Sequence, residues 1–297
     1  VIGQLSGPIG QVISFSQSLQ DAKISLERLN EINNKEDEIV TVESKINTLP
    51  EDKTIKMENV SFSYDGAERE YVLENLNLTI PQNKVTAIVG ASGSGKTTII
   101  KLLLGFYEPV KGDIKVGSYS IKDINPHLWR QNTGAVMQEG FLFSDSIANN
   151  IALSDENVDH KKLLKAVETA NIKDFIESLP LKYNSKIGME GSGVSQGQKQ
   201  RLLIARTIYK SPMFIFFDEA TNALDANNER IITDNLKPFY EGRTVVTVAH
   251  RLSTVQNADN IVVLDNGKII EEGTHRELTE KKGAYYTLVK NQLELGA

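Results

Sequence analysis

The chain has 297 residues, of which 40% are hydrophobic and 24% are charged, a composition typical of a soluble globular protein with one or two domains. Its net charge of −6 argues against general affinity for nucleic acids, which requires a basic surface. The absence of cysteine excludes disulfide bonds, cysteine metal ligands and a cysteine nucleophile. Because the chain begins at Val1 and shows no signal-peptide pattern, we expect it to be a fragment of a longer protein.

The first 20 residues contain no charged side chain, and apolar residues recur among them at roughly helical spacing. Two interpretations stay open. The stretch is either an amphipathic helix that lies on the domain, or the inner end of a transmembrane helix that faces other helices or water, because its glutamines and serines make it too polar to face lipid. We expect the helix to continue through residues 22–32, and the polar, acidic residues 33–53 to form a linker.

The pattern changes to strands from residue 54 onward. Residues 55–64 and 73–80 alternate between apolar and polar side chains, which predicts a hairpin with its loop at residues 65–70. Residues 113–136 contain short strands interrupted by a break at Pro126, and residues 141–182 are mostly helical, with Lys161–Ser178 as the clearest helix. The chain is therefore predicted to be an α/β protein with a helical insertion. Buried strands are expected at residues 85–89, 133–137, 213–217 and 244–249, and a hairpin at residues 261–271 around Asp265-Asn266-Gly267.

One glycine-rich stretch, Gly90–Thr97 (GASGSGKT), fits the phosphate-binding template G-x-x-x-x-G-K-[ST]. It lies between the strand at residues 85–89 and a helix predicted at residues 98–104, and this context distinguishes it from an ordinary glycine-rich turn. The glycines allow successive backbone N–H groups to point at an anion, and the helix N-terminus adds its dipole. Lys96 can reach the outer phosphates, and the Thr97 hydroxyl can bind Mg²⁺.

Polar residues follow three of the other predicted strands directly. They are Gln138, the pair Asp218 and Glu219, and His250. The carboxyl ends of parallel strands are where α/β sheets bind ligands, so one carboxylate of the pair can hold Mg²⁺ while the other orients water. The glycine- and serine-rich residues 188–197 precede a strongly helical stretch at residues 198–209, which makes this helix N-terminus a second candidate anion site.

These motifs resemble, in unbroken order over residues 54–297, the ATP-binding domain of an ABC transporter. In that family Gln138 matches the glutamine that senses Mg²⁺ and the membrane domains, and Val194–Gln198 (VSQGQ) matches the signature loop. Ala223–Asp225 (ALD) matches the loop that touches the partner subunit. His250 matches the switch histidine, and Tyr64 matches the aromatic residue that stacks on adenine, although an aromatic residue in a strand is by itself more often part of the core.

The resemblance implies a P-loop NTPase (RecA-like) core with an N-terminal antiparallel β-subdomain and an inserted helical subdomain at about residues 139–211. It implies an ATPase that uses ATP and Mg²⁺, with Lys96, Glu219 and His250 as catalytic residues and Thr97, Gln138 and Asp218 at the metal. The nucleotide-binding residues that it implies are Tyr64, Gly90, Ala91, Ser92, Gly93, Ser94, Gly95, Lys96, Thr97, Thr98, Gln138, Ser195, Gly197 and Gln198.

The partners that the resemblance implies are a second copy, in a head-to-tail dimer around two ATP molecules, and the transmembrane domain of the same chain, with no nucleic acid. Residues 1–32 would then be the end of the last transmembrane or intracellular helix. The fragment would be soluble by itself and would act at the cytoplasmic face of a bacterial inner membrane. The runs GVSQGQKQR and DEATNALD look most like those of bacterial peptide or bacteriocin exporters, some of which carry a peptidase domain.

Two positions depart from the family pattern. Gln196 replaces the first glycine of the usual Leu-Ser-Gly-Gly-Gln signature, and Met189-Glu190 stands where exporters usually carry Glu-Arg. Two other functions fit the sequence less well. An ABC ATPase of chromosome maintenance or translation is disfavoured, because no long coiled-coil heptads separate Lys96 from Ser195 and only one phosphate loop is present. A nucleotide-binding module without turnover is disfavoured by Glu219.

Overall fold

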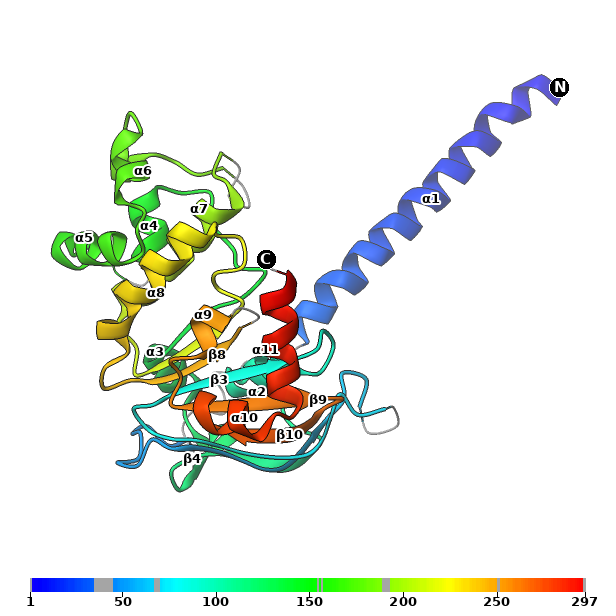
Figure 1. Ribbon diagram of the computed structural model, residues 1–297. Helices are drawn as coiled ribbons and strands as arrows, with labels where there is room; N and C mark the ends of the chain where they lie inside the picture. Colours follow the sequence, from blue (N-terminus) through cyan, green and yellow to red (C-terminus); the bar gives the residue numbers. More distant parts are fainter. Residues whose placement is uncertain are drawn as a thin grey trace. The chain divides into compact units, whose positions relative to one another are not determined.

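The computed structural model describes residues 2–34, 45–66, 70–153, 155, 157–188, 193–249 and 252–295. The chain divides into two compact units, Val1–Lys45 and Ile46–Ala297 (Figure 1). The first unit contains the helix α1 (Ile2–Asn33), which includes Pro8. Within the described ranges, no helix combines the length and the apolar character that are needed to cross a membrane.

Strands and helices are interspersed along the second unit (Figure 1). Its strands are β1 (Ile55–Phe62), β2 (Leu73–Ile80), β3 (Val85–Gly90), β4 (Lys111–Val116), β5 (Tyr119–Ser120), β6 (Thr133–Val136), β7 (Phe214–Asp218), β8 (Thr244–Val248), β9 (Asn260–Asp265) and β10 (Lys268–Gly273). Its helices are α2 (Lys96–Leu103), α3 (Pro126–Asn132), α4 (Ile147–Ile151), α5 (His160–Thr169), α6 (Lys173–Ser178), α7 (Gln196–Lys210), α8 (Ala226–Tyr240), α9 (Leu252–Val255), α10 (His275–Lys281) and α11 (Ala284–Leu295), with short 3-10 turns η2 (Ile121–Asp123) and η3 (Lys182–Asn184).

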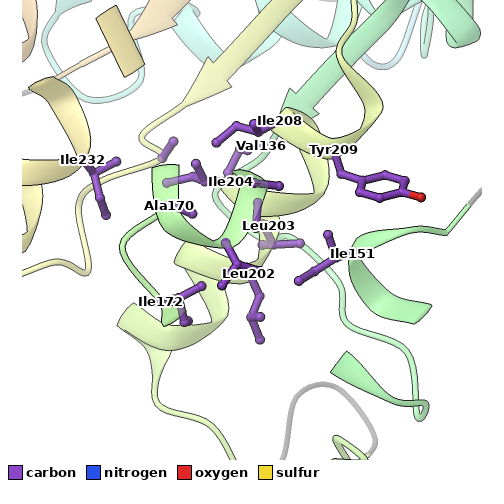
Figure 2. Close-up of a cluster of buried hydrophobic side chains, with 14 of the residues drawn as sticks. Val136, Ile151, Ala170, Ile172, Leu202, Leu203, Ile204, Ile208, Tyr209 and Ile232 are labelled. Carbon is purple, nitrogen blue, oxygen red and sulfur yellow. The ribbon is translucent and has the colours of Figure 1, made fainter. Parts of the chain in front are cut away.

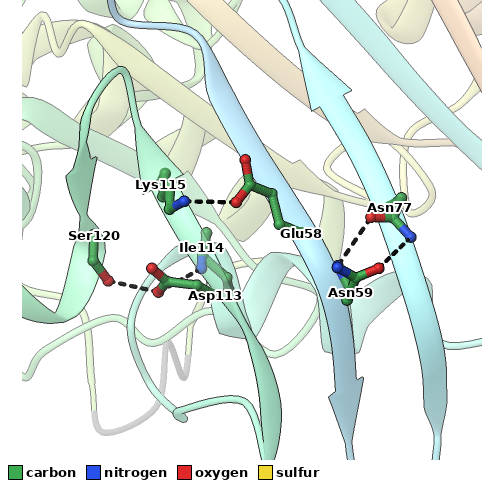
Figure 3. A network of polar contacts seen from close by, with 7 residues as sticks. All are labelled: Glu58, Asn59, Asn77, Asp113, Ile114, Lys115 and Ser120. Carbon is green, nitrogen blue, oxygen red and sulfur yellow. Dashed lines mark hydrogen bonds and ion pairs between the residues drawn. The ribbon is translucent and has the colours of Figure 1, made fainter.

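A four-stranded antiparallel sheet has the strand order β2-β1-β4-β5. The predicted pairing of β1 with β2 is confirmed, with Ile55 opposite Ile80. Polar side chains also link neighbouring strands of this sheet (Figure 3). The Lys115 ammonium lies 2.6 Å from the Glu58 carboxylate, and the Asn77 amide donates a 3.2 Å hydrogen bond to Asn59 Oδ1. These cross-strand pairs add modest stabilisation to the pairing of β4 with β1 and of β1 with β2.

A six-stranded sheet has the order β10-β9-β3-β8-β7-β6. The neighbours from β9 to β6 are parallel, whereas β10 pairs antiparallel with β9. The predicted hairpin around residues 265–267 is confirmed. Asn266 and Gly267 have φ values of 43° and 74°, the left-handed conformations that a two-residue type I′ turn requires. The carboxyl ends of all five parallel strands therefore lie at one edge of the sheet, where the end of each strand is next to the end of its neighbour.

Buried side chains cover both faces of the six-stranded sheet, as a strand buried on both sides requires. In β7, Phe214 and Phe216 belong to the core that is shared with the four-stranded sheet, whereas Ile215 and Phe217 belong to the core of the helical region. Figure 2 shows the second core, in which Leu202 and Ile204 of α7 lie among residues of neighbouring helices. The sequence-predicted helical insertion thus rests on the same sheet that carries the phosphate loop.

Two details differ from the predictions. The helix expected over Lys161–Ser178 is broken into α5 and α6, because Asn171 adopts a left-handed φ of 51° between them and its side chain bonds Asn228. The break predicted at Pro126 is instead the start of α3. Asn125 caps that helix by accepting a hydrogen bond from the His127 N–H, and proline suits the first helical position because its missing N–H needs no partner there.

The core of the helical region generates a stability prediction. Ile204 is fully buried, so Ile204→Ala should lower the free energy of unfolding by about 2–5 kcal/mol through lost apolar contacts and the remaining cavity. Leu164→Ala on α5 is the control, because Leu164 is 42% exposed and its truncation should cost less than about 0.5 kcal/mol. Urea denaturation measures both changes. Equal losses in the two variants would contradict the placement of Ile204 in the core.

Candidate active site

The phosphate loop begins with a close approach between two strands. Gly90, at the end of β3, has a φ of 154°, and a Cβ atom there would lie 2.0 Å from the Leu264 carbonyl oxygen of β9. Gly95 has a φ of 102°, and a Cβ atom there would lie 2.7 Å from the Leu73 side chain. Both positions require glycine for conformation and for space. The loop can therefore turn sharply from β3 into α2, with the helix N-terminus facing the strand end.

Lys96 is the first residue of α2, and its side chain folds back over the loop. Its ammonium donates hydrogen bonds of 3.0 Å to the Gly90 carbonyl and 2.7 Å to the Ala91 carbonyl. Burial lowers the pKa of Lys96, while the carboxylates of Glu219 and Asp218 oppose this shift. The positive charge is thus held over the loop in a poorly hydrated place, where its electrostatic effect on an anion is stronger than in water.

Asp218, at the end of β7, lies against the phosphate loop. The Thr97 hydroxyl donates a 3.2 Å hydrogen bond to Asp218 Oδ1. Asp218 Oδ2 is buried and accepts no hydrogen bond from the residues that the structure describes. Burial raises the pKa of Asp218, and the Thr97 hydrogen bond and the Lys96 charge act in the opposite direction. A hydroxyl and a carboxylate with one unpaired oxygen form a donor set that suits a hard cation such as Mg²⁺.

Glu219 follows Asp218 in a strained backbone conformation, with a φ of 52° that few non-glycine residues adopt. Its N–H donates a 3.1 Å hydrogen bond to the Val248 carbonyl at the end of β8, and its carboxylate accepts a hydrogen bond from the Asn222 amide. The carboxylate is therefore held at the same sheet edge as Asp218. The predicted switch residue His250, two positions beyond β8, lies outside the described residues, as do Met189 and Glu190.

Gln138 lies two residues beyond the end of β6, at the same edge of the sheet. The loop that follows it is tied to α7 by Arg206, which donates hydrogen bonds of 2.9 Å to the Phe141 carbonyl and 2.8 Å to the Asn150 carbonyl. Burial lowers the pKa of Arg206 to about 10, so the side chain stays charged at neutral pH. The loop after Gln138 is thus connected to α7 through hydrogen bonds to a half-buried cation.

The signature loop ends at the N-terminus of α7, which begins at Gln196, two residues before the predicted start of the helix. Ser195 and Gln198 form a capping box, in which the Ser195 hydroxyl accepts from the Gln198 N–H and the Gln198 side chain accepts from the Ser195 N–H at 2.8 Å. The side chain of Gln196 is exposed and takes no part in this cap. Among the described residues, no hydrogen bond joins Ser195, Gly197 or Gln198 to the phosphate loop.

Gln200, which lies on α7 and is 4% exposed, is not among the predicted site residues. Its amide nitrogen donates a 3.4 Å hydrogen bond to the Glu219 carbonyl, and its amide oxygen accepts a 3.0 Å hydrogen bond from the Ala223 N–H. Gln200 therefore connects the signature helix to the loop that carries Glu219. A signal was present in the sequence, because Gln200 lies in helical phase with the buried residues Leu203, Ile204 and Thr207.

Tyr64 lies just beyond β1 and is 45% exposed, so it is not a core residue. Its hydroxyl lies 3.1 Å from the Thr98 hydroxyl of α2. The structure thus brings part of the predicted site into one connected group, while Gln138 and the signature loop lie on neighbouring elements. The connected group consists of Tyr64, Lys96, Thr97, Thr98, Asp218 and Glu219.

Comparison with known proteins agrees with this geometry. A family model described as "ABC transporter" matches residues 73–222. The leukotoxin translocation ATP-binding protein LktB of Mannheimia haemolytica is 40% identical over 294 residues, which cover 99% of this chain and 41% of that protein. The LktB protein of Bibersteinia trehalosi gives the same values. The structure of a bacterial Atm1-family ABC exporter with ATP bound matches with a TM-score of 0.84 and 34% identity, covering 92% of this chain and 47% of that one.

The chain therefore belongs to the ABC transporter family, and it contains an ATP-binding domain that is an ATPase. The predicted fold class is confirmed by the two sheets and the helical insertion, which match the exporter structure. The likeness to a leukotoxin translocation protein and to an exporter structure agrees with the predicted resemblance to exporters. The chain spans less than half the length of these relatives.

The exposed position of Gln196 generates a prediction for the signature loop. Gln196→Gly restores the usual family residue without touching the Ser195–Gln198 cap, so ATP turnover should equal or exceed that of the parent chain. The matched variant Ser195→Ala removes the cap and should cost about 1 kcal/mol of stability. Turnover of Gln196→Gly and melting curves of both variants provide the test. A large loss of turnover in Gln196→Gly would reveal a role for this side chain.

Proposed function

We propose that this chain is the ATP-hydrolysing part of an exporter, in which ATP turnover drives movement of a transmembrane domain of the same protein. The observation that carries the proposal is the convergence of Lys96, Thr97, Asp218 and Glu219 at one edge of the parallel sheet. The similarity to a leukotoxin translocation protein and to an exporter supports the transport role. We further propose a peptide or protein as the exported substrate.

In this proposal the loop from Gly90 to Thr98 surrounds the phosphates of ATP. The N–H groups at the start of α2 are suited to binding an anion. The Ser94 hydroxyl, which is buried without a partner among the described residues, is a further donor for it. Lys96 exchanges its bonds to the Gly90 and Ala91 carbonyls for bonds to the outer phosphate oxygens. Tyr64 carries the adenine ring by stacking, as aromatic side chains do with bases.

Thr97, Asp218 and Gln138 would hold Mg²⁺ together with phosphate oxygens. Asp218 fits this role because its Oδ2 atom is buried and unpaired among the described residues and its Oδ1 atom already lies 3.2 Å from the Thr97 hydroxyl. No group of three or more His, Cys, Asp or Glu residues within the described ranges could form a metal site by itself, so phosphate and water oxygens would complete the shell. When bound, Mg²⁺ neutralises charge on the phosphates.

Hydrolysis requires that a water oxygen attacks the γ-phosphorus while the bond to the β–γ bridging oxygen breaks and ADP leaves. We propose that Glu219 orients this water and accepts its proton, since the Glu219 carboxylate is fixed by Asn222 and by the hydrogen bond from its N–H to Val248. Lys96 offsets the negative charge on the γ-phosphate, and His250 contacts the same group. Catalysis then consists of positioning and electrostatic stabilisation.

The proposed site is completed by a second copy of the chain. Ser195, Gly197 and Gln198 lie at the N-terminus of α7, which makes them suitable for binding a γ-phosphate, but their hydrogen bonds in one copy stay within the signature helix. We therefore propose a head-to-tail dimer with two ATP molecules between the copies, each held by the phosphate loop of one chain and the signature loop of the other.

The proposed organisation assigns residues 1–32 to the end of a transmembrane or intracellular helix, residues 33–53 to a linker and residues 54–297 to the ATP-binding domain, with the helical subdomain at about residues 139–211. The domain would act at the cytoplasmic face of a bacterial inner membrane. The net charge of −6 gives no support for a nucleic-acid partner.

The role of Lys96 gives the test of the ATPase site. Lys96→Ala should lower ATP turnover by at least about 100-fold, because one charge-stabilising donor at the phosphates is lost. The matched control is Lys84→Ala. Lys84 is an exposed lysine that lies just before β3 and pairs with Asp259, so its removal should leave turnover unchanged. Phosphate release from purified, folded proteins is the measurement. Full activity of Lys96→Ala would refute the assignment of the phosphate loop.

The two-chain site predicts an ATP-dependent dimer. Without nucleotide the chain should sediment as a monomer. Glu219→Gln keeps the shape of the side chain but removes the proton acceptor, so this variant should accumulate as a dimer with ATP and Mg²⁺. Bound ATP favours the dimer by the difference between its affinities for the dimer and for the monomer, so the dimer fraction should rise with the ATP concentration.

The control for this experiment is Glu219→Gln combined with Ser195→Arg, which places bulk and charge at the proposed interface and should restore the monomer. Sedimentation velocity of the three samples separates the states. A Glu219→Gln protein that binds ATP and stays monomeric at high concentration would contradict an interface formed by this chain alone.

A further inference from the structure

Tyr64 belongs to a cluster of three aromatic rings beside the phosphate loop. The ring centroids of Tyr64 and Tyr107 lie 5.3 Å apart with an interplanar angle of 89°, and those of Tyr64 and Phe62 lie 5.0 Å apart at 83°. Phe62 and Tyr107 also contact each other, at 5.5 Å. Edge-to-face geometry at these distances is favourable for aromatic pairs. An exposed ring is thus held from two sides before any ligand is bound.

Tyr107 is itself fixed to the phosphate-loop helix. After α2 the chain forms a tight C-terminal turn, in which the Phe106 N–H donates to the Lys101 carbonyl at 3.0 Å and the Gly105 N–H donates to the Leu102 carbonyl at 3.0 Å. Gly105 has the left-handed φ of 73° that this turn requires. The turn ends one residue before Tyr107. The end of α2 therefore determines where the Tyr107 backbone lies.

The other contacts of Tyr64 come from the same helix. Its hydroxyl lies 3.1 Å from the Thr98 hydroxyl, and the Lys101 ammonium lies 5.4 Å from its ring centroid. Tyr64 follows β1 in the sequence, but these contacts attach its ring to α2. The base platform and the phosphate loop are therefore connected through one helix, although they come from different sheets.

We propose that Tyr107 is a positioning residue for nucleotide binding, which holds the Tyr64 ring in the orientation that receives the base. The inference rests on the proposed function, in which adenine stacks on Tyr64. A side chain that is ordered before binding loses less conformational entropy when the ligand arrives, so the affinity for a ligand with a base is higher. A ligand that consists only of phosphates does not touch Tyr64 and gains nothing from Tyr107.

The test compares ADP with inorganic tripolyphosphate in calorimetric titrations. Tyr107→Ala should weaken the binding of ADP about two- to tenfold, the range expected for loss of one aromatic pair, and should leave the binding of tripolyphosphate unchanged. Tyr107→Phe keeps the ring and should restore the parent affinity for ADP. The matched control is Phe106→Ala, since Phe106 is adjacent and 62% exposed but makes no ring contact with Tyr64 among the described residues.

Three outcomes would overturn the inference. Unchanged ADP affinity in Tyr107→Ala, alongside a loss in Tyr64→Ala, would overturn this inference while leaving the proposed base platform intact. Equal losses for ADP and tripolyphosphate would show that the variant disturbs α2 itself. Failure of the parent chain to bind ADP would overturn the proposed function together with the inference. Because Tyr107 is 42% exposed, melting curves should show that the variants fold like the parent.

Discussion

The close approach of Gly90 to β9 is the constraint on which the rest of this site depends. With the Leu264 carbonyl oxygen 2.0 Å from where a Cβ atom would lie, any other residue would push β3 away from its neighbour or move the loop. Because β3 stays tightly paired between β8 and β9, the phosphate loop leaves the sheet at a fixed point. The carboxylates at the end of β7 can then meet the start of α2, where Lys96 and Thr97 lie.

The charges at this point stabilise one another at a cost in hydration. Burial lowers the pKa of Lys96 and raises the pKa of Asp218, so each group taken alone would tend towards its neutral form. The carboxylates act on Lys96, and Lys96 and Thr97 act on Asp218, in the direction that keeps both groups charged. Such a balance of buried charges is characteristic of functional sites, where groups that bind ions are assembled before the ligand arrives.

Helix α7 joins the parts of the molecule that surround this centre. At its N-terminus lies the capped signature loop, in its middle Gln200 holds the backbone beside Glu219, and further along Arg206 holds the loop that follows Gln138. The apolar residues between them pack into the core of the helical region (Figure 2). A displacement of α7 would therefore move both loops, and in the proposed function this connection would link ATP binding to the transmembrane domain.

The sequence by itself determined the phosphate loop, the buried strands and the residues that follow them, because these features depend on local patterns such as glycine spacing and apolar runs. It also determined the family, since several motifs occur in one order. Only the tertiary structure decided that Thr97 bonds Asp218, that Gln200 supports Glu219, and that Tyr107 contacts Tyr64. Each of these contacts joins residues on different elements, and their distance is set by strand order and helix packing, which no local pattern in the chain specifies.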